Sequence, residues 1–240
     1  MTHRDELAKN AQLTMKPKDI LGEVDYQTMC VRFDPKDKYI AAGCSDGTIK
    51  IFNVLTGKPS YTLNSGMESS FPMTSIKWRP LDGPGITKNV LISANASGII
   101  SHWHTTSGKE LNRIEEKGNQ ILGIDYSPDG TMFASCGKDT VVRVYDEMER
   151  EEPILNLTGS ATGKPGHSSN VTCVKFNTQD KNILISGGWD NTIQVWDLRT
   201  GDTVRSIYGP YVAGDSLDII DDLILSGQYR QENQLQIWDL

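Results

Sequence analysis

The sequence predicts an all-β fold built from repeated units of antiparallel strands. Runs of β-branched and aromatic residues alternate with short polar turns along almost the whole chain, and this pattern is typical of strands. An apolar period of 3.6 residues, which an amphipathic helix requires, does not persist beyond the N-terminal stretch. The strand pattern also recurs at a regular spacing, which indicates a repeat architecture.

The repeat unit is clearest between residues 171 and 208. The segments 171–176 and 183–197 contain three strand-like runs, the last of them at 193–197, and a fourth run covers 203–208. Polar turns that contain Gly, Asp, Asn and Thr separate the runs, and these residues favour tight turns. We therefore predict a sheet of four antiparallel strands.

Five copies of this unit are visible, and the third strand of each copy carries an aromatic residue near its end. These aromatic residues lie 51, 42, 51 and 42 positions apart. The shorter step fits a repeat of about 40–45 residues, and the longer steps contain insertions at 81–88 and 147–169 that we interpret as extended loops. After an N-terminal segment at 1–25, the region 26–240 is predicted to contain repeats at about 26–64, 71–115, 119–157, 167–208 and 214–240.

In the fourth repeat, His167 precedes the first strand, Ser186 lies on the second, Asp190 lies in the next turn and Trp196 lies on the third. This pattern resembles the WD-repeat (WD40) β-propeller family. In that family such residues form a buried hydrogen-bond chain, in which each polar atom has a partner. The resemblance implies a β-propeller of four-stranded antiparallel blades, with five WD-type repeats visible as part of a seven-bladed propeller.

The other repeats depart from this pattern. The first has Ala42 in place of the Ser, the second has Ser97 in place of the Asp, and the third lacks the His. In the fifth repeat, Arg230 and a longer turn replace the Asp. We expect these blades to be held mainly by apolar packing, and the fourth to be the most stable.

Five repeats are too few for a seven-bladed ring, which needs about 300 residues at about 42 per blade. We favour a fragment of a longer seven-bladed protein. A short chain that assembles through its open edges and a five-bladed ring are the alternatives. In this family one terminus often completes the last blade, and residues 12–21 are predicted to donate such a strand.

Composition narrows the classes of partner. The net charge is −7 and the cations form no stripe, so nucleic acid is an unfavoured partner. The apolar runs are shorter than the ~18 residues that a membrane span needs, which predicts a cytoplasmic protein, with nuclear and ciliary locations as alternatives. Four widely spaced cysteines favour buried, reduced thiols over a structural zinc site: Cys30, Cys44, Cys136 and Cys173.

Three groups of residues resemble chemical sites, and we interpret each as structural. His102 and His104 share a strand face but lack a third metal ligand. The segment 159–165 looks like a phosphate-binding loop, but its glycines are too close together. His167, Asp190 and Ser186 are the residue types of a catalytic triad, but their spacing matches that of the buried hydrogen-bond chain. Acidic residues at 147–152 and 221–222 are expected to be solvated, so no catalytic residue, metal or cofactor is predicted.

The resemblance implies a platform that binds proteins or peptides on the face where the turns gather. Trp189 is the first candidate, because a large aromatic residue in a polar turn is costly to expose without use. The alternative is that Trp189 folds back over a neighbouring loop. We predict a non-enzymatic subunit or adaptor of a multi-protein complex; an RNA-binding propeller and a propeller-based enzyme are the alternatives. The candidate binding residues are Trp189, Tyr229, Arg230, Lys138, Tyr26, Phe71, Gln120 and Asn170.

Overall fold

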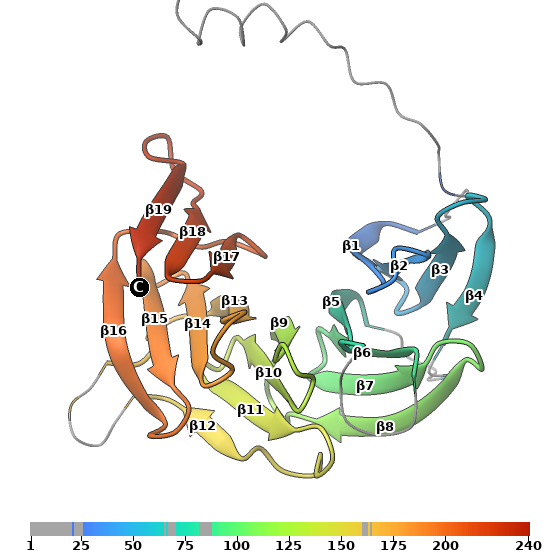
Figure 1. The fold of residues 1–240 in the computed structure, drawn as a ribbon, viewed down its shortest axis with the longest axis horizontal. Coiled ribbons are helices and arrows are strands. Elements are labelled where there is room, and N and C mark those ends of the chain that lie inside the picture. Colours follow the sequence, from blue (N-terminus) through green and yellow to red (C-terminus); the bar gives the residue numbers. More distant parts are fainter. Residues whose placement is uncertain are drawn as a thin grey trace, which may run out of the picture.

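A computed structural model describes residues 21, 26–64, 66, 71–81, 88–159, 163 and 165–240. Within these ranges the chain forms nineteen β-strands and no helix, so the predicted all-β class is confirmed. The strands make five antiparallel sheets that stand around a common centre like the blades of a propeller (Figure 1). Since the described residues form no helix, they contain none long and apolar enough to span a membrane.

Each sheet is one blade, and its strands follow one another from the centre to the rim, with the first strand innermost. Blade one contains β1 (Thr28–Phe33), β2 (Tyr39–Cys44), β3 (Ile49–Asn53) and β4 (Pro59–Leu63), and blade two contains β5 (Met73–Trp78), β6 (Val90–Asn95), β7 (Ile99–His104) and β8 (Lys109–Glu115). Blade three contains β9 (Ile121–Tyr126), β10 (Met132–Gly137), β11 (Val142–Asp146) and β12 (Leu155–Leu157), and blade four contains β13 (Val171–Phe176), β14 (Ile183–Gly188), β15 (Thr192–Asp197) and β16 (Asp202–Tyr208). Blade five contains β17 (Leu217–Ile220), β18 (Leu223–Gly227) and β19 (Leu235–Asp239).

The turns between the second and third strands repeat one backbone device. Each turn has a residue with positive φ, a conformation that glycine and asparagine adopt most readily. Four of the five are Gly or Asn, and blade three instead has the β-branched Thr140 at φ 70°. The positive-φ residues are Gly47, Gly98, Thr140, Asn191 and Asn233.

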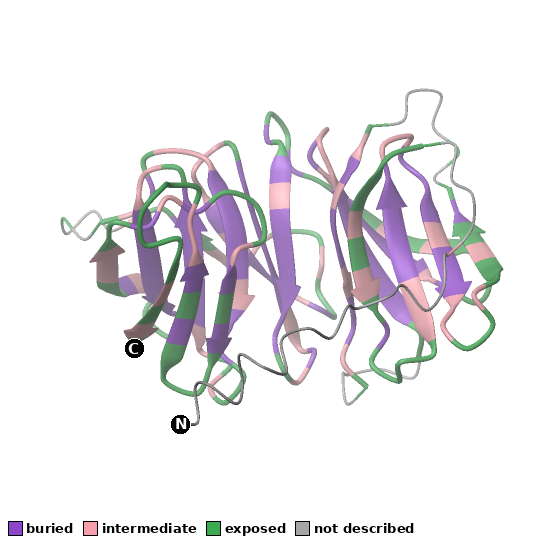
Figure 2. Ribbon diagram, turned by 90° about the horizontal axis from the view of Figure 1, so that it is seen from above, coloured by how far each residue is buried: buried purple, intermediate pink, exposed green. Residues whose placement is uncertain are grey.

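The apolar core is divided among the interfaces between neighbouring blades. Four clusters of buried residues lie between successive pairs of blades. The third-strand aromatic always faces the preceding blade: Trp103 packs with blade one, Tyr145 with blade two, and Trp196 with blade three. The first three strands of blades two, three and four are mostly buried, and Figure 2 shows long buried stretches in the middle of the molecule. One blade therefore stabilises the next, as the repeat pattern predicts.

The five blades form an arc whose first and last sheets do not pack against each other (Figure 1). Blade five has three strands among the described residues, where the other blades have four. The predicted closing strand at 12–21 lies outside the described residues, apart from Leu21. The loop that we predicted at 147–169 contains a short strand, β12, which completes blade three. Seven blades and the exact repeat boundaries stay predictions.

Candidate functional site

One end of the propeller collects the loops before the inner strands and the turns between second and third strands. The same backbone hydrogen bond joins the two in every blade, from the N–H just before or within the turn to a carbonyl before the inner strand. We call this end the turn end. The five donor and acceptor pairs are Ser45 to Gln27, Ala96 to Pro72, Lys138 to Gln120, Trp189 to Asn170, and Gly227 to Ser216.

Blade four contains a complete hydrogen-bond chain that runs from the turn end into the blade. His167 lies with Nδ1 2.8 Å from Asp190 Oδ2 and with Nε2 2.7 Å from the Ser186 hydroxyl. The Trp196 indole donates to the same hydroxyl over 2.8 Å. Burial alone would raise the pKa of Asp190, but hydrogen bonds from His167, Ser168 and Thr192 hold it below its ordinary value.

The hydrogen-bond chain gives these residues a structural role, so they are not free for catalysis. Ser186 is fully buried, and its hydroxyl already has two partners. A nucleophile must reach its substrate and needs donors for the developing oxyanion. The arrangement of Ser186, His167 and Asp190 therefore orders the turn that carries Trp189.

Blade three has a buried hydrogen-bond chain of its own, in addition to the apolar packing that we expected to be its main support. Glu116 occupies the place of the missing His and accepts hydrogen bonds from Ser135 and from the Tyr145 hydroxyl. Arg143 pairs with its other oxygen over 3.1 Å, and Asn119 donates to it over 2.7 Å. A carboxylate and a tyrosine therefore replace the imidazole and the indole of blade four.

Glu147 is also buried, which corrects the expectation that the acidic run at 147–152 is solvated. Its side chain is fully enclosed between blades two and three, where it pairs with Arg79 over 3.1 Å and with Arg150 over 2.8 Å. His102 and the Tyr126 hydroxyl complete its shell. Burial alone would raise the pKa of Glu147, but the bonds from these partners hold it below its ordinary value.

The two strand histidines have separate environments. His102 is fully buried and its Nε2 faces Glu147, while burial lowers the pKa of its imidazole. His104 bonds instead to the hydroxyls of Ser107 and Thr106 at the surface. Across the described ranges, the His, Cys, Asp and Glu side chains form no group of three suited to a metal ion.

Three aromatic residues gather at the turn end of blades four and five. The rings of Trp189 and Tyr211 stack with their centroids 6.4 Å apart and an angle of 16°. Tyr229 lies beside them, because its N–H donates to the Tyr211 carbonyl. Arg230 reaches from the same turn to the Asn191 side chain. We call Trp189, Tyr211, Tyr229 and Arg230 the aromatic patch.

The patch combines order with exposure. Trp189 is 44% exposed and Tyr229 is 84% exposed. Trp189 does lean on a neighbouring loop, as its alternative interpretation expects, yet nearly half of its surface stays open. Tyr211 is a member that our sequence reasoning missed. The available signal was an aromatic residue in the Gly-Pro-Tyr-Val loop directly before an inner strand.

The remaining predicted residues are spread along the same end without joining the patch, apart from Asn170. The Asn170 carbonyl accepts the Trp189 N–H and so supports the patch from below. The other four precede inner strands or lie in the turns of blades one to three. All four are exposed: Tyr26, Phe71, Gln120 and Lys138.

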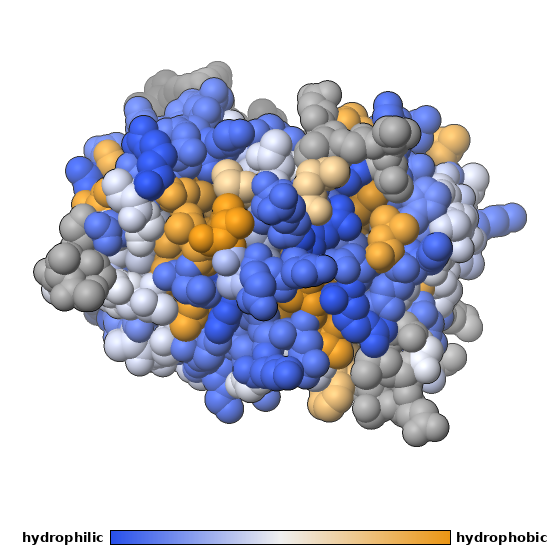
Figure 3. All heavy atoms as spheres, turned by 90° about the horizontal axis from the view of Figure 1, so that it is seen from below, coloured by the Kyte–Doolittle hydropathy of each residue, from blue (hydrophilic) through white to orange (hydrophobic). Residues whose placement is uncertain are grey.

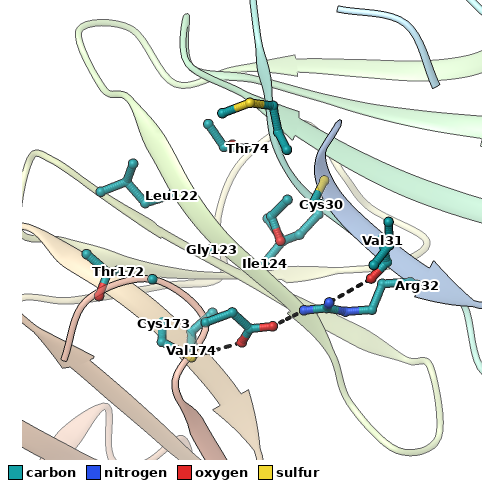
Figure 4. A pocket seen from close by; sticks show the side chains of 14 residues that line it. Cys30, Val31, Arg32, Thr74, Leu122, Gly123, Ile124, Thr172, Cys173 and Val174 are labelled. Carbon is teal, nitrogen blue, oxygen red and sulfur yellow. Dashed lines mark hydrogen bonds and ion pairs between the residues drawn. The ribbon is translucent and has the colours of Figure 1, made fainter. Parts of the chain in front are cut away.

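A second recess lies at the centre of the arc. A cavity of about 350 Å³ is lined by the inner strands β1, β5, β9 and β13 and by the loop before β17 (Figure 4). Asp215 on that loop pairs with Arg32 of β1 and, over 2.8 Å, with Lys175 of β13. Figure 4 shows Arg32 reaching into this space. These ion pairs join the loop before β17 to blade one and to blade four.

The side of the rim that carries β8, β11 and β12 has no single apolar face. Figure 3 views the side on which β8, β11 and β12 lie, and hydrophilic residues cover most of it. Hydrophobic residues appear there in separate areas. Scattered apolar residues are normal on a protein surface, so the ordered aromatic cluster at the turn end is the more specific candidate for a binding site.

Comparison with known proteins finds similarity to WD-repeat proteins in both sequence and fold. The family model described as WD domain, G-beta repeat, matches residues 22–53, 108–146 and 159–197. A solved chain in the crystal structure of the mitotic checkpoint complex superposes with a TM-score of 0.76 at 22% identity. The superposition covers 92% of this chain and 64% of that chain.

Curated proteins give similar matches at low identity. A ribosome biogenesis protein WDR12 homolog of Drosophila yakuba is 28% identical over 67% of this chain and 39% of its own length. The E3 ubiquitin-protein ligase COP1 of Pisum sativum is 25% identical over 88% of this chain and 30% of its own. Protein SUPPRESSOR OF PHYA-105 1 of Arabidopsis thaliana is 24% identical over 95% of this chain and 21% of its own. The matches thus span about two fifths or less of these relatives.

Proposed function

Because the chain is a WD-repeat protein, we propose that it is a non-enzymatic scaffold that binds peptides or protein domains, as a subunit or adaptor of a larger complex. The single observation that carries this proposal is the aromatic patch. Large aromatic residues dominate the energetics of protein interfaces. The stack of Trp189 on Tyr211 also limits the entropy that the indole loses when a partner binds.

The buried chains support a scaffold over an enzyme. In blade four, His167, Ser186 and Asp190 are engaged with one another and with Trp196. In blades two and three, Glu116 and Glu147 are surrounded by their own donors. These are the acids and bases that an active site would need, and each has a structural partner instead.

An RNA-binding propeller in an RNA-processing complex is the second candidate. The observation in its favour is the similarity to the fruit-fly relative, which is a ribosome biogenesis protein. This similarity makes the nucleus a second location to examine, in addition to the cytoplasm, which the composition favours. The net charge of −7 opposes binding of a polyanion.

The experiment that tests the proposal is capture of partners by the tagged full chain in nuclease-treated and untreated extract. We expect a protein to be retained in near-stoichiometric amounts after nuclease treatment. Trp189→Ala and Tyr229→Ala should each reduce its recovery at least fivefold, while Tyr208→Ala on the outer strand β16 should not. Retention that disappears with nuclease would favour the RNA candidate. Equal recovery by all variants would contradict a role for the patch.

A further inference from the structure

The aromatic patch has a chemistry that selects one mode of peptide recognition. We propose that it binds a proline-containing segment in the extended polyproline II conformation. This inference rests on the proposed scaffold function and names the chemistry of its partner. Prolines present flat apolar rings, and the backbone of a polyproline II helix carries carbonyl groups without internal partners. A site for such a segment needs ordered aromatic rings and side-chain donors.

The rings are held in place before any partner arrives. Trp189 is fixed at its backbone by Asn170 and at its indole by the stack on Tyr211. Tyr211 is itself held by a hydrogen bond from its N–H to Gln228 and by the adjoining Val212, which is fully buried. Tyr229 stands beside this pair with most of its ring exposed. The segment would therefore meet the preformed stack of Trp189 on Tyr211, with the exposed Tyr229 on the adjoining turn.

Side-chain donors lie beside Tyr229. An open hollow of about 360 Å³ is lined by Tyr229, Arg230 and three glutamines. Gln228 uses its amide to bind the carbonyls of Glu232 and Asn233, which shapes the turn. The exposed Gln231 and Gln234 make no side-chain hydrogen bond within the described part of the chain. They are available to donate to the carbonyls of a bound segment.

Other peptide modes fit the patch less well. Addition of a strand needs an unpaired strand edge, whereas the patch is made of turns and a loop. A helix needs a long apolar groove, whereas glutamines and Arg230 line most of this hollow. Recognition of a strongly charged motif is not favoured either, because Arg230 and the exposed Glu232 offset each other on one turn.

Single-stranded RNA also stacks on aromatic rings, but it needs cations along its backbone. Arg230 is the cation of the patch, and one of its nitrogens already binds Asn191. The chain as a whole carries a net charge of −7, which repels phosphates and leaves a neutral proline segment unaffected. The geometry and the charge together favour the proline segment.

The test uses the full chain and two pools of fluorescein-labelled ten-residue peptides in an anisotropy titration. One pool contains Pro-x-x-Pro with the other positions mixed, and its control has Ala at both proline positions. We expect the proline pool to bind at least tenfold more tightly than the control. Trp189→Ala and Tyr229→Ala should weaken it at least tenfold. Tyr208→Ala, a matched exposed tyrosine on β16, should leave it unchanged. Because Tyr229 is exposed on a turn, its variant tests the site without disturbing the fold.

Several results would overturn the proposal. Equal binding of both pools would remove the role of proline, and full binding by both patch variants would remove the role of the rings. If poly(U) displaces the peptides, and Trp189→Ala and Tyr229→Ala also weaken the binding of poly(U), the patch is a site for RNA. If a captured protein depends on Trp189 and the proline pool neither binds nor displaces it, the scaffold function stands and this inference fails. If the proline pool binds and no protein is captured, the scaffold function fails and this inference stands.

Discussion

Phe176 in blade four and Phe33 in blade one occupy the same position of their inner strands, in the matching segments Cys-Val-Lys-Phe and Cys-Val-Arg-Phe. Phe176 is 4% exposed, and Phe33 is 58% exposed. Blade three covers the first residue, whereas no described sheet covers the second. Burial in this fold therefore depends on the neighbouring blade and not on the strand sequence alone.

The other end of the arc shows the same effect. Ile193 of β15 is fully buried under blade five, and the equivalent Leu235 of β19 is 69% exposed. Apolar side chains also remain open at the neighbouring positions of blade five, among them Leu223, Leu225 and Ile237. The repeated sequence makes equivalent surfaces, and their environments differ only by whether a blade covers them.

The largest effect should come from truncating the paired phenylalanines. Phe176→Ala removes a buried ring and leaves a cavity, so it should lower the free energy of unfolding by about 3–5 kcal/mol. Phe33→Ala removes a ring that is already mostly in water, so it should cost about 1 kcal/mol or less. Urea unfolding of the two variants measures the difference. Equal losses would show that Phe33 is covered in solution.

A smaller difference in stability is expected between variants of two serines whose hydroxyls each accept a hydrogen bond from a tryptophan indole. Ser186→Ala deprives both Trp196 and His167 of a buried partner and should cost about 2–4 kcal/mol. Ser226→Ala deprives Trp238 alone, and that indole is only partly buried, so the loss should be about 1 kcal/mol. Thermal and urea unfolding report both values. A larger loss for Ser226→Ala would contradict the greater importance of the complete chain.

The smallest effect should be a gain in stability when Thr140 is replaced. Thr140 is β-branched and holds φ at 70° in the turn of blade three, where blades one and two have glycine. Thr140→Gly relieves that strain and should raise the free energy of unfolding by about 0.5–1 kcal/mol. The equivalent Gly47→Thr should lower it by a similar amount. A loss of stability in Thr140→Gly would mean that the threonine side chain contributes contacts that outweigh the strain.

Local patterns were enough to predict the strands, the turns and the hydrogen-bond chain of blade four. Strand propensity and turn composition act over a few residues, and the four members of that chain carry a family spacing. Glu116 and Glu147 were missed because their burial depends on distant partners. Arg79 reaches Glu147 from 68 positions away, and Tyr145 reaches Glu116 from 29. In the sequence both carboxylates sit among charged neighbours and look solvated.

The same dependence on distant contacts explains why only part of the aromatic patch was predicted. Trp189, Tyr229 and Arg230 were identified because an aromatic residue or a cation in a turn is informative by itself. Tyr211 could not be paired with Trp189 from sequence, since the stack depends on how the loop before β17 crosses the turn of blade four. The prediction that the other turn residues share one end follows from the repeat, and their common backbone hydrogen bond agrees with it.

The most direct test of the scaffold function is a photocrosslink from single positions. A benzophenone amino acid replaces Tyr229 in one full-length variant and Tyr208 in another, since both tyrosines are exposed but only the first lies in the patch. After irradiation in nuclease-treated extract, we expect position 229 to form a discrete protein adduct that position 208 does not form. Equal adducts from both positions, or none from position 229, would contradict the account.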